Sequence, residues 1–120
     1  MHMKISELKF DANGLIPAIV QEARTGEVMM MAWMNKKAVA LTLTTGYTHF
    51  WSRSRKQYWK KGETSGSLQE VKEVLYDCDQ DVLLVQVIQH GKGACHTGER
   101  TCFFRTLRPE DTDEILKEVQ

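Results

Sequence analysis

The stretch "LIPAIVQEARTGEVMMMAWM", from Leu15 to Met34, contains two apolar runs separated by a short polar segment. The runs are Leu15–Ala23 and Val28–Met34, and the polar segment between them contains Gly26. Glycine readily adopts the positive φ that tight hairpin turns require. The stretch therefore predicts an antiparallel β-hairpin, and with it a fold that contains a sheet.

The sequence that follows predicts a helix and further strands. Asn35 is a suitable N-cap for a helix over Lys36–Thr45, and Gly46 is a suitable residue to end it. The other expected elements are strands at Tyr47–Ser52, Glu70–Tyr76, Val82–Gln89 and Cys102–Leu107, loops at Arg53–Gly66 and His90–Arg100, and a helix at Pro109–Val119. Strands joined by short turns predict an α+β fold with a mostly antiparallel sheet and two or three helices.

The length and composition of the chain indicate its number of domains and exclude some kinds of partner. A chain of 120 residues predicts a single domain over residues 1–120. A formal net charge of zero argues against nucleic-acid binding through bulk charge, and we expect no nucleic-acid partner. No apolar run approaches the roughly 20 residues of a membrane span, so we expect no membrane association. Three cysteines cannot all pair in disulfides within one chain, which favours reduced thiols and a cytoplasmic protein.

The segment "GACHTGERTC", from Gly93 to Cys102, places two cysteines and a histidine close together. With Cys78 they form a set of thiolates of the kind that binds Zn²⁺. Three protein ligands would leave a fourth position open for water, as in hydrolytic zinc sites. His96 would fill that position or act as an acid or base beside it. The alternative is three unrelated cysteines in the core.

Three aspartates, Asp77, Asp79 and Asp81, alternate with Cys78 and Gln80. Carboxylates this close repel one another unless a cation neutralises them, and hard oxygen ligands suit Mg²⁺. If the segment is extended, Cys78 points away from the aspartates and would reach a different metal, or a second subunit. The alternative is a solvated acidic turn.

A basic segment over residues 51–66 combines arginines, lysines, hydroxyl groups and two tryptophans. Such side chains suit the binding of phosphate groups, and a tryptophan can stack on a base. The alternative is a solvated loop with two core tryptophans. The candidate substrate-binding residues are Trp51, Arg53, Arg55, Lys61 and Ser65.

Taken together, these segments resemble phosphoribosyl-AMP cyclohydrolase of histidine biosynthesis. The resemblance rests on "WSRSR", "WKKGETSG", "DCDQD" and "GACHTGERTCFF", and it spans Leu15 to Phe104. Lys36 and Lys37 depart from the acids that relatives often carry there. In many organisms the domain is fused to a pyrophosphohydrolase, and we expect this chain to be monofunctional.

The resemblance implies a function and a set of roles. The family hydrolyses the N1–C6 bond of the adenine ring in 1-(5-phosphoribosyl)-AMP. Carried over to this chain, it implies an intertwined homodimer with shared zinc sites. Cys78, Cys95 and Cys102 would bind zinc, with Cys78 coming from the other subunit. Mg²⁺ would be held by Asp77, Asp79 and Asp81.

Two other classes compete with this interpretation. One is an RNA-binding module in which zinc is a structural staple and the basic loop contacts RNA. The other is a nucleobase or nucleotide deaminase, although the H-x-E and C-x-x-C motifs of the zinc deaminases are missing here.

Overall fold

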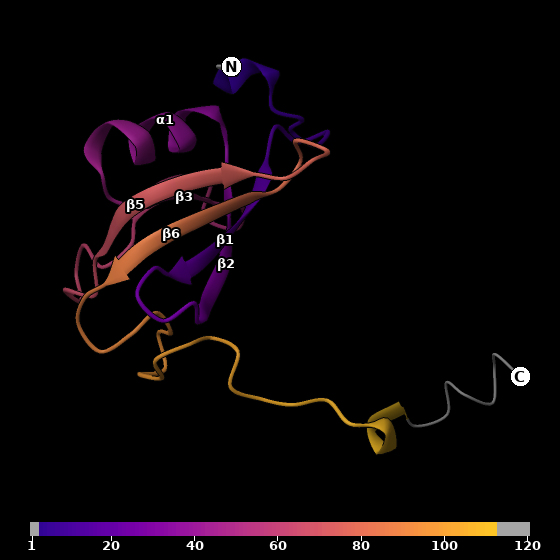
Figure 1. Cartoon of the computed structure of the whole chain (residues 1–120), viewed down its shortest axis with the longest axis vertical. Helices are drawn as coiled ribbons and strands as arrows, with labels where there is room; N and C mark the ends of the chain where they lie inside the picture. The colour runs from indigo at the N-terminus through magenta and orange to yellow at the C-terminus, as the bar shows by residue number, and fades with distance from the viewer. Residues whose placement is uncertain (1–2, 113–120) are drawn as a thin grey trace, which may run out of the picture.

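The computed structural model describes residues 3–112 and has a four-stranded sheet at its centre (Figure 1). The strand order is β2-β1-β6-β5. Neighbouring strands are antiparallel except for β1 and β6, which are parallel. The strands are β1 (Ile16–Glu22), β2 (Val28–Met34), β5 (Gln69–Tyr76) and β6 (Leu83–Gln89).

The hairpin expected at the start of the chain is confirmed. β1 pairs antiparallel with β2, and Gly26 in the turn has a φ of 79°. Along β1, residues alternate strictly between buried and partly buried positions. This pattern is expected of a strand with one face on the core, because successive side chains point to opposite faces.

The predicted helix is also confirmed, and its bounds agree with the expectation. α1 covers Lys36–Thr45, and the Asn35 side chain caps it by accepting a hydrogen bond from the Ala38 backbone N–H. Gly46 ends it with a left-handed φ of 79°. The buried side of α1 packs near β3 and η1, the 3₁₀ turn at Ile5–Glu7 (Figure 1).

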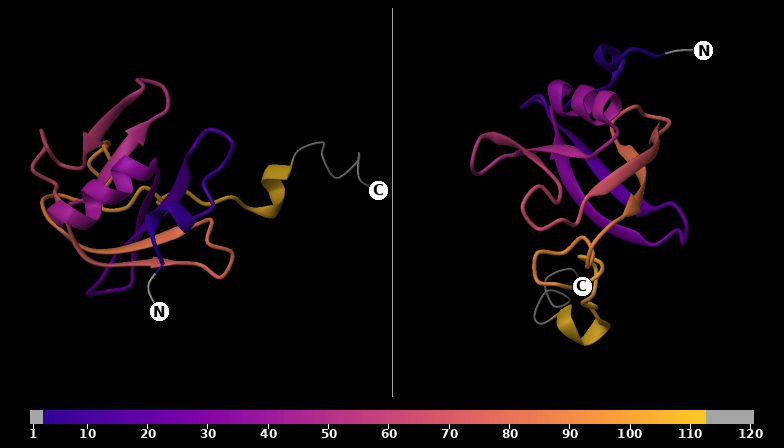
Figure 2. Two further views of the ribbon diagram at one scale, coloured as in Figure 1. Left: turned by 90° about the horizontal axis from the view of Figure 1, so that it is seen from above. Right: turned by 90° about the vertical axis from the view of Figure 1, so that its left-hand side faces the viewer.

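The expectation of a loop over residues 53–66 was wrong for its middle part. β3 (His49–Ser52) pairs antiparallel with β4 (Gln57–Lys60) in a second, two-stranded sheet. Figure 2 shows this hairpin projecting from the larger sheet. The Phe50 and Trp59 rings lie opposite each other with centroids 4.8 Å apart. Cross-strand aromatic packing therefore supports a strand in a segment whose polar residues predicted a loop.

The strands predicted on either side of the acidic segment are confirmed as β5 and β6, which pair antiparallel. The parallel pairing of β6 with β1 was not expected. It joins Val20 to Val85, residues far apart in the sequence, and local patterns carry no information about such a contact. The pairing brings the side chains of both strands into one core, which contains Leu8, Ile16, Ala18, Val20, Met29, Met30, Met34, Ala38, Val39, Phe50, Leu83, Val85, Val87 and Ala94.

The C-terminal part departs from the expectation. The strand predicted over Cys102–Leu107 was wrong, because these residues form no strand and are exposed. The backbone stays close to β2 only as far as Cys102, whose N–H donates to the Met29 carbonyl, and it then leaves the sheet (Figure 1). Of the predicted C-terminal helix, Pro109–Thr112 is the 3₁₀ helix η2, and the rest lies outside the described residues.

Within the described residues, the number of helices differs from the two or three predicted. Residues 3–112 contain one α-helix, α1, and the two short 3₁₀ helices η1 and η2. Within these residues, no helix has the length and apolar character needed to cross a membrane. The intertwined homodimer stays a prediction.

Candidate functional site

The loop after β6 folds back on itself and carries two of the three cysteines. The Ala94 N–H donates to the Arg100 carbonyl over 2.8 Å, and the Cys95 N–H donates to the Glu99 carbonyl over 3.2 Å. Gly93 is required here, because a Cβ atom would lie 2.4 Å from the Arg100 Cα. This close backbone contact brings the Cys95 and Cys102 side chains within hydrogen-bonding reach of each other.

The two thiols have different electrostatic environments. Hydrogen bonds from Thr97, whose Oγ1 lies 3.0 Å from the Cys95 Sγ, lower the pKa of Cys95. Partial burial raises the pKa of Cys102, and the nearby Cys95 raises it further. The positive charge of Lys61 favours the thiolate form of both. A pair of this kind fits a thiolate-binding metal such as Zn²⁺.

A pocket of about 630 Å³ opens beside Cys95. Lys61 lies in its wall and donates a hydrogen bond from Nζ to the Ala94 carbonyl, next to Cys95. His96 and Ser65 also line it. The structure therefore brings together four residues that were singled out separately in the sequence.

The other predicted substrate-binding residues surround a second pocket, of about 730 Å³. Trp51, Arg53 and Arg55 line it together with Trp33 and Trp59. The Arg53 guanidinium lies 4.8 Å from the centroid of the Trp33 ring, a cation–π contact that keeps the arginine close to the aromatic wall.

The two pockets are joined by a shallower hollow along the same hairpin. This hollow has a volume of about 300 Å³. Arg55 lines both it and the aromatic pocket, while Lys61 and Ser65 line both it and the cysteine pocket. The candidate binding surface is thus continuous from the tryptophans to the cysteines.

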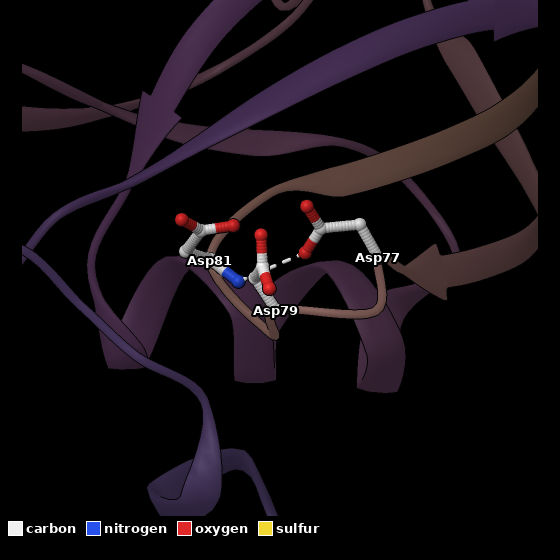
Figure 3. Close-up of side chains that lie close together, drawn as sticks. All are labelled: Asp77, Asp79 and Asp81. Carbon is white, nitrogen blue, oxygen red and sulfur yellow. Dashed lines mark hydrogen bonds between the residues drawn. The ribbon is translucent and has the colours of Figure 1, made fainter.

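The acidic segment forms a tight turn between β5 and β6 (Figure 3). The Asp77 carboxylate accepts hydrogen bonds from the Asp81 and Val82 backbone N–H groups over 3.0 and 3.2 Å. One oxygen from each of Asp77, Asp79 and Asp81 lies within 4.8 Å of the others, and all three residues are exposed. A hydrogen bond with the Asp77 side chain raises the pKa of Asp81, and the charges of Asp77 and Asp79 add to this rise. Three carboxylates this close fit a hard divalent cation.

The argument that put Cys78 and the aspartates on opposite faces of an extended strand was wrong. Residues 78 and 79 form a turn, and Gln80 has a positive φ of 65°, so strand alternation does not apply. Cys78 is exposed in this turn. The separation of Cys78 from the other two cysteines has a different origin, the length of β6.

Cys78 and Cys95 flank opposite ends of β6. A strand of seven residues is about 23 Å long at a rise of roughly 3.3 Å per residue. Within residues 3–112, the aspartates of the turn are the only group of three or more His, Cys, Asp or Glu side chains close enough to share a metal ion. The three cysteines of one chain therefore do not meet.

The comparisons with known proteins identify the family of this chain. The family model described as "Phosphoribosyl-AMP cyclohydrolase" matches residues 30–104, which include the β3–β4 and β5–β6 hairpins and both candidate metal-binding segments. The chain belongs to this family.

Individual relatives extend the match beyond those bounds. A phosphoribosyl-AMP cyclohydrolase of Pelotomaculum thermopropionicum is 55% identical over 120 residues, covering 100% of this chain and 92% of the relative. One of Archaeoglobus fulgidus is 56% identical over 105 residues, covering 88% of this chain and 96% of the relative. The histidine biosynthesis bifunctional protein HisIE of Prochlorococcus marinus is 52% identical over 118 residues, which are 98% of this chain and 53% of that protein.

Several residues in the walls of the pockets were missed in the sequence. Trp33 lies in β2, where it was assigned to an apolar strand, yet it lines the aromatic pocket. Ser67 and Lys92 line the cysteine pocket. Serine and lysine in loops are common, and only the pairing of distant segments shows which of them face a pocket.

Proposed function

We propose that this chain opens the adenine ring of 1-(5-phosphoribosyl)-AMP by hydrolysis of the N1–C6 bond, as a step of histidine biosynthesis, with zinc and magnesium bound. The observation that carries the proposal is the pocket in which Cys95, His96, Lys61 and Ser65 meet, in a chain of the phosphoribosyl-AMP cyclohydrolase family.

Zinc would be held by Cys95 and Cys102 of one chain and Cys78 of a second copy. The adjacent thiols of the loop fit this metal, and the length of β6 supports a third ligand from another chain. When bound there with an open position, zinc would lower the pKa of a water ligand to about 7 and make it a nucleophile at neutral pH.

Magnesium would be held by the three aspartates of the turn. One oxygen from each aspartate lies within 4.8 Å of the others, a spacing that suits a shared divalent cation. Cys78 lies between Asp77 and Asp79 in the sequence. A turn that delivered Cys78 to the partner's cysteine pair would therefore bring the magnesium site to the same pocket, close to the phosphate groups of the substrate.

The chain's own residues would orient the substrate along the continuous surface. Trp51, together with Trp33 and Trp59, offers aromatic faces for the purine. Arg53, Arg55, Lys61 and Ser65 offer cations and a hydroxyl group for the two phosphates. These groups would hold C6 against the cysteine end of the surface.

His96 would deliver the proton that the reaction needs. Ring opening requires a proton at N1, so that the C6–N1 bond breaks and leaves a carboxamide. His96 lines the cysteine pocket, which supports this role because an imidazole there could give a proton to a bound substrate.

The experiment is to incubate the purified protein, loaded with Zn²⁺ and Mg²⁺, with phosphoribosyl-AMP and to record ultraviolet absorbance and free ammonia. Ring opening changes the purine chromophore and releases no ammonia. Ammonia release would identify a deaminase instead. An unchanged spectrum combined with RNA binding would favour the zinc-stapled module.

A further inference from the structure

Four polar side chains are buried between the sheet and the cysteine pocket. Glu22, Thr48 and Gln69 are 0% exposed, and Gln89 is 5% exposed. Burying such groups costs free energy unless each one is hydrogen-bonded. Among the described residues, every buried side-chain nitrogen and oxygen has a partner, so these four form a satisfied network.

The centre of the network is a pair of amides from adjacent strands. Gln69 and Gln89 are directly opposite each other in the β5–β6 ladder, and the Gln69 Nε2 donates to the Gln89 Oε1 over 2.8 Å. The Thr48 hydroxyl donates to the Gln69 Oε1 over 2.8 Å. On the other side, the Gln89 backbone N–H donates to the Glu22 carboxylate over 2.9 Å, which connects the pair to β1.

The Gln89 amide connects two walls of the cysteine pocket. Its Nε2 donates to the Ser67 carbonyl over 3.2 Å and to the His90 carbonyl over 3.0 Å. Ser67 and Gly91, which follows His90, both line the pocket. These walls touch, because a Cβ atom on Gly91 would lie 2.6 Å from the Ser67 Oγ. One buried side chain thus reinforces the backbone bond from the His90 N–H to the Leu68 carbonyl, over 2.9 Å, in setting the spacing between two segments that are far apart in the sequence.

A second branch of the network reaches Lys61. The Thr48 N–H donates to the Gln69 carbonyl over 3.2 Å, and the Thr48 carbonyl accepts from the Lys61 N–H over 3.1 Å. Lys61 in turn donates from its ammonium group to the Ala94 carbonyl beside Cys95. The Gln69–Gln89 pair is therefore linked to each of the segments that surround Cys95 and His96.

We propose that Gln89, supported by Gln69, is a positioning residue that fixes the walls of the pocket around the reacting part of the substrate. The inference rests on the proposed function. An apolar side chain would fill the same space, but it has no donor for the Ser67 and His90 carbonyls. The two walls would then lose the group that holds them at one spacing, and small misplacements of this kind reduce turnover more than they reduce binding.

The test compares Gln89→Leu with a matched core variant, Val85→Ala. Val85 lies on the same strand, is fully buried and contacts no pocket wall through a polar group. For both variants, kcat, KM, zinc content, melting temperature and amide hydrogen exchange are measured, the last on the metal-free protein as well. We expect Gln89→Leu to lower kcat by about tenfold or more at nearly unchanged KM and zinc content. The amides of His90 and Gly91 should exchange faster. Val85→Ala should have a lower melting temperature than wild type. Its kcat and the exchange rates of the His90 and Gly91 amides should stay those of wild type.

A second variant, Gln89→Glu, retains the shape of the side chain. In its protonated form it donates one hydrogen bond, so it can replace one of the two bonds that the amide donates to the Ser67 and His90 carbonyls. Burial, the Glu22 carboxylate and the carbonyls of Ser67 and His90 should raise its pKa. The other charged groups nearby are Arg24, paired with Glu22, and the exposed His90–Glu70 pair. Because wild type has these groups too, its pH profile is the reference. The protonated Gln89→Glu variant should recover turnover at low pH. As the pH rises and the new carboxyl ionises, turnover should fall, and the pH profile of wild type should show no such fall.

The outcomes distinguish a failure of the proposed role of Gln89 from a failure of the proposed enzymatic function. If Gln89→Leu keeps wild-type kcat and wild-type exchange at His90, the inference is wrong. If that variant does not fold, a Gln89→Glu profile parallel to that of wild type overturns the inference instead. If wild type itself does not open phosphoribosyl-AMP, the proposed function fails, and the hydrogen-exchange comparison alone decides whether Gln89 holds the walls.

Discussion

The two ends of the β5–β6 hairpin both carry candidate metal ligands, yet they are stabilised in different ways. The turn that contains the aspartates is held mainly by bonds within itself, such as those from the Asp81 and Val82 backbone N–H groups to the Asp77 side chain, and by one distant bond from the Lys9 N–H to the Gln80 carbonyl over 2.8 Å. The cysteine loop is also held by distant partners. The Thr101 hydroxyl donates to the Val28 carbonyl, and Arg100 pairs with Glu27 over 2.7 Å.

This difference indicates how each end can be altered. A turn closed mainly by its own bonds depends little on the rest of the sheet, so its substitutions should act mainly on metal binding. A loop anchored through distant residues depends on the whole sheet. Substitutions far from the cysteines should therefore change the conformation or the stability of the cysteine loop.

The largest expected effect is at the cysteine loop. Cys95→Ser should no longer bind zinc, and its turnover should fall by at least about 10³-fold. The reason is that a metal-activated water supplies several kcal/mol of transition-state stabilisation. Metal analysis and the absorbance assay check this. Full turnover in a verified zinc-free Cys95→Ser protein would refute the zinc proposal.

Mixing two inactive variants tests whether the aspartate turn of one chain and the cysteine loop of another chain form a shared site. Cys78→Ser and Cys95→Ser are each expected to be inactive, but a heterodimer would have one intact site and one site lacking both ligands. Activity should return, up to about half per heterodimer in an isologous pair. Subunit exchange is verified by mass spectrometry. If exchange occurs and activity stays absent, the sites are not shared between chains.

The aspartate turn should respond more narrowly. Asp79→Asn removes one of three anionic ligands and should raise the Mg²⁺ concentration needed for activity on the order of tenfold or more. Zinc content should stay near that of wild type, as measured by metal analysis. Asp111→Asn, at an exposed aspartate of η2, is the control. Loss of zinc in Asp79→Asn would contradict the division of the two metals.

Glu22 tests the dependence of the cysteine end on the sheet. Hydrogen bonds from Arg24, and a further one from the Gln89 backbone, lower the pKa of this buried carboxyl from 4.5 to about 2. A lowered pKa in the folded state stabilises the protein above pH 4.5, and this stabilisation is lost as the pH falls towards 2. At pH 7, Glu22→Gln should cost about 1–3 kcal/mol of unfolding free energy, allowing for the solvent exposure of Arg24.

Denaturant titrations of Glu22→Gln and wild type at several pH values measure this effect. The difference between the two proteins should shrink as the pH falls below 4.5. Glu27→Gln, which removes an exposed partner of Arg100, should cost less and serves as the control. A difference that stayed constant down to pH 2 would show that the charge of Glu22 is not the cause.

The smallest expected effect lies on the β3–β4 hairpin, away from both ends. Arg53→Ala should raise KM by roughly tenfold and leave kcat nearly unchanged, because a phosphate contact is present in both the ground state and the transition state. Steady-state kinetics check this, with the exposed Arg108→Ala as the control. A fall in kcat at constant KM would instead assign Arg53 to the chemical step.

The sequence alone determined the locally encoded parts of this protein. The alternation in β1, the Asn35 cap and Gly46 each act within a few residues, so their patterns predicted β1, β2 and α1 with nearly the observed bounds. The residue types of the two candidate metal-binding segments indicated thiolate and carboxylate chemistry for the same reason. The family resemblance was carried by short motifs within those segments and within the basic segment over residues 51–66.

Only the tertiary structure decided which of these segments meet. The parallel pairing of β1 with β6 and the Gln69–Gln89 pair join residues far apart in the chain, and cross-strand aromatic packing supports β4 as a strand. Such contacts depend on how side chains fill a shared core, and no local pattern encodes them. They determine that Lys61 lies beside Cys95, that Trp33 faces Arg53, and that the length of β6 separates Cys78 from the other cysteines.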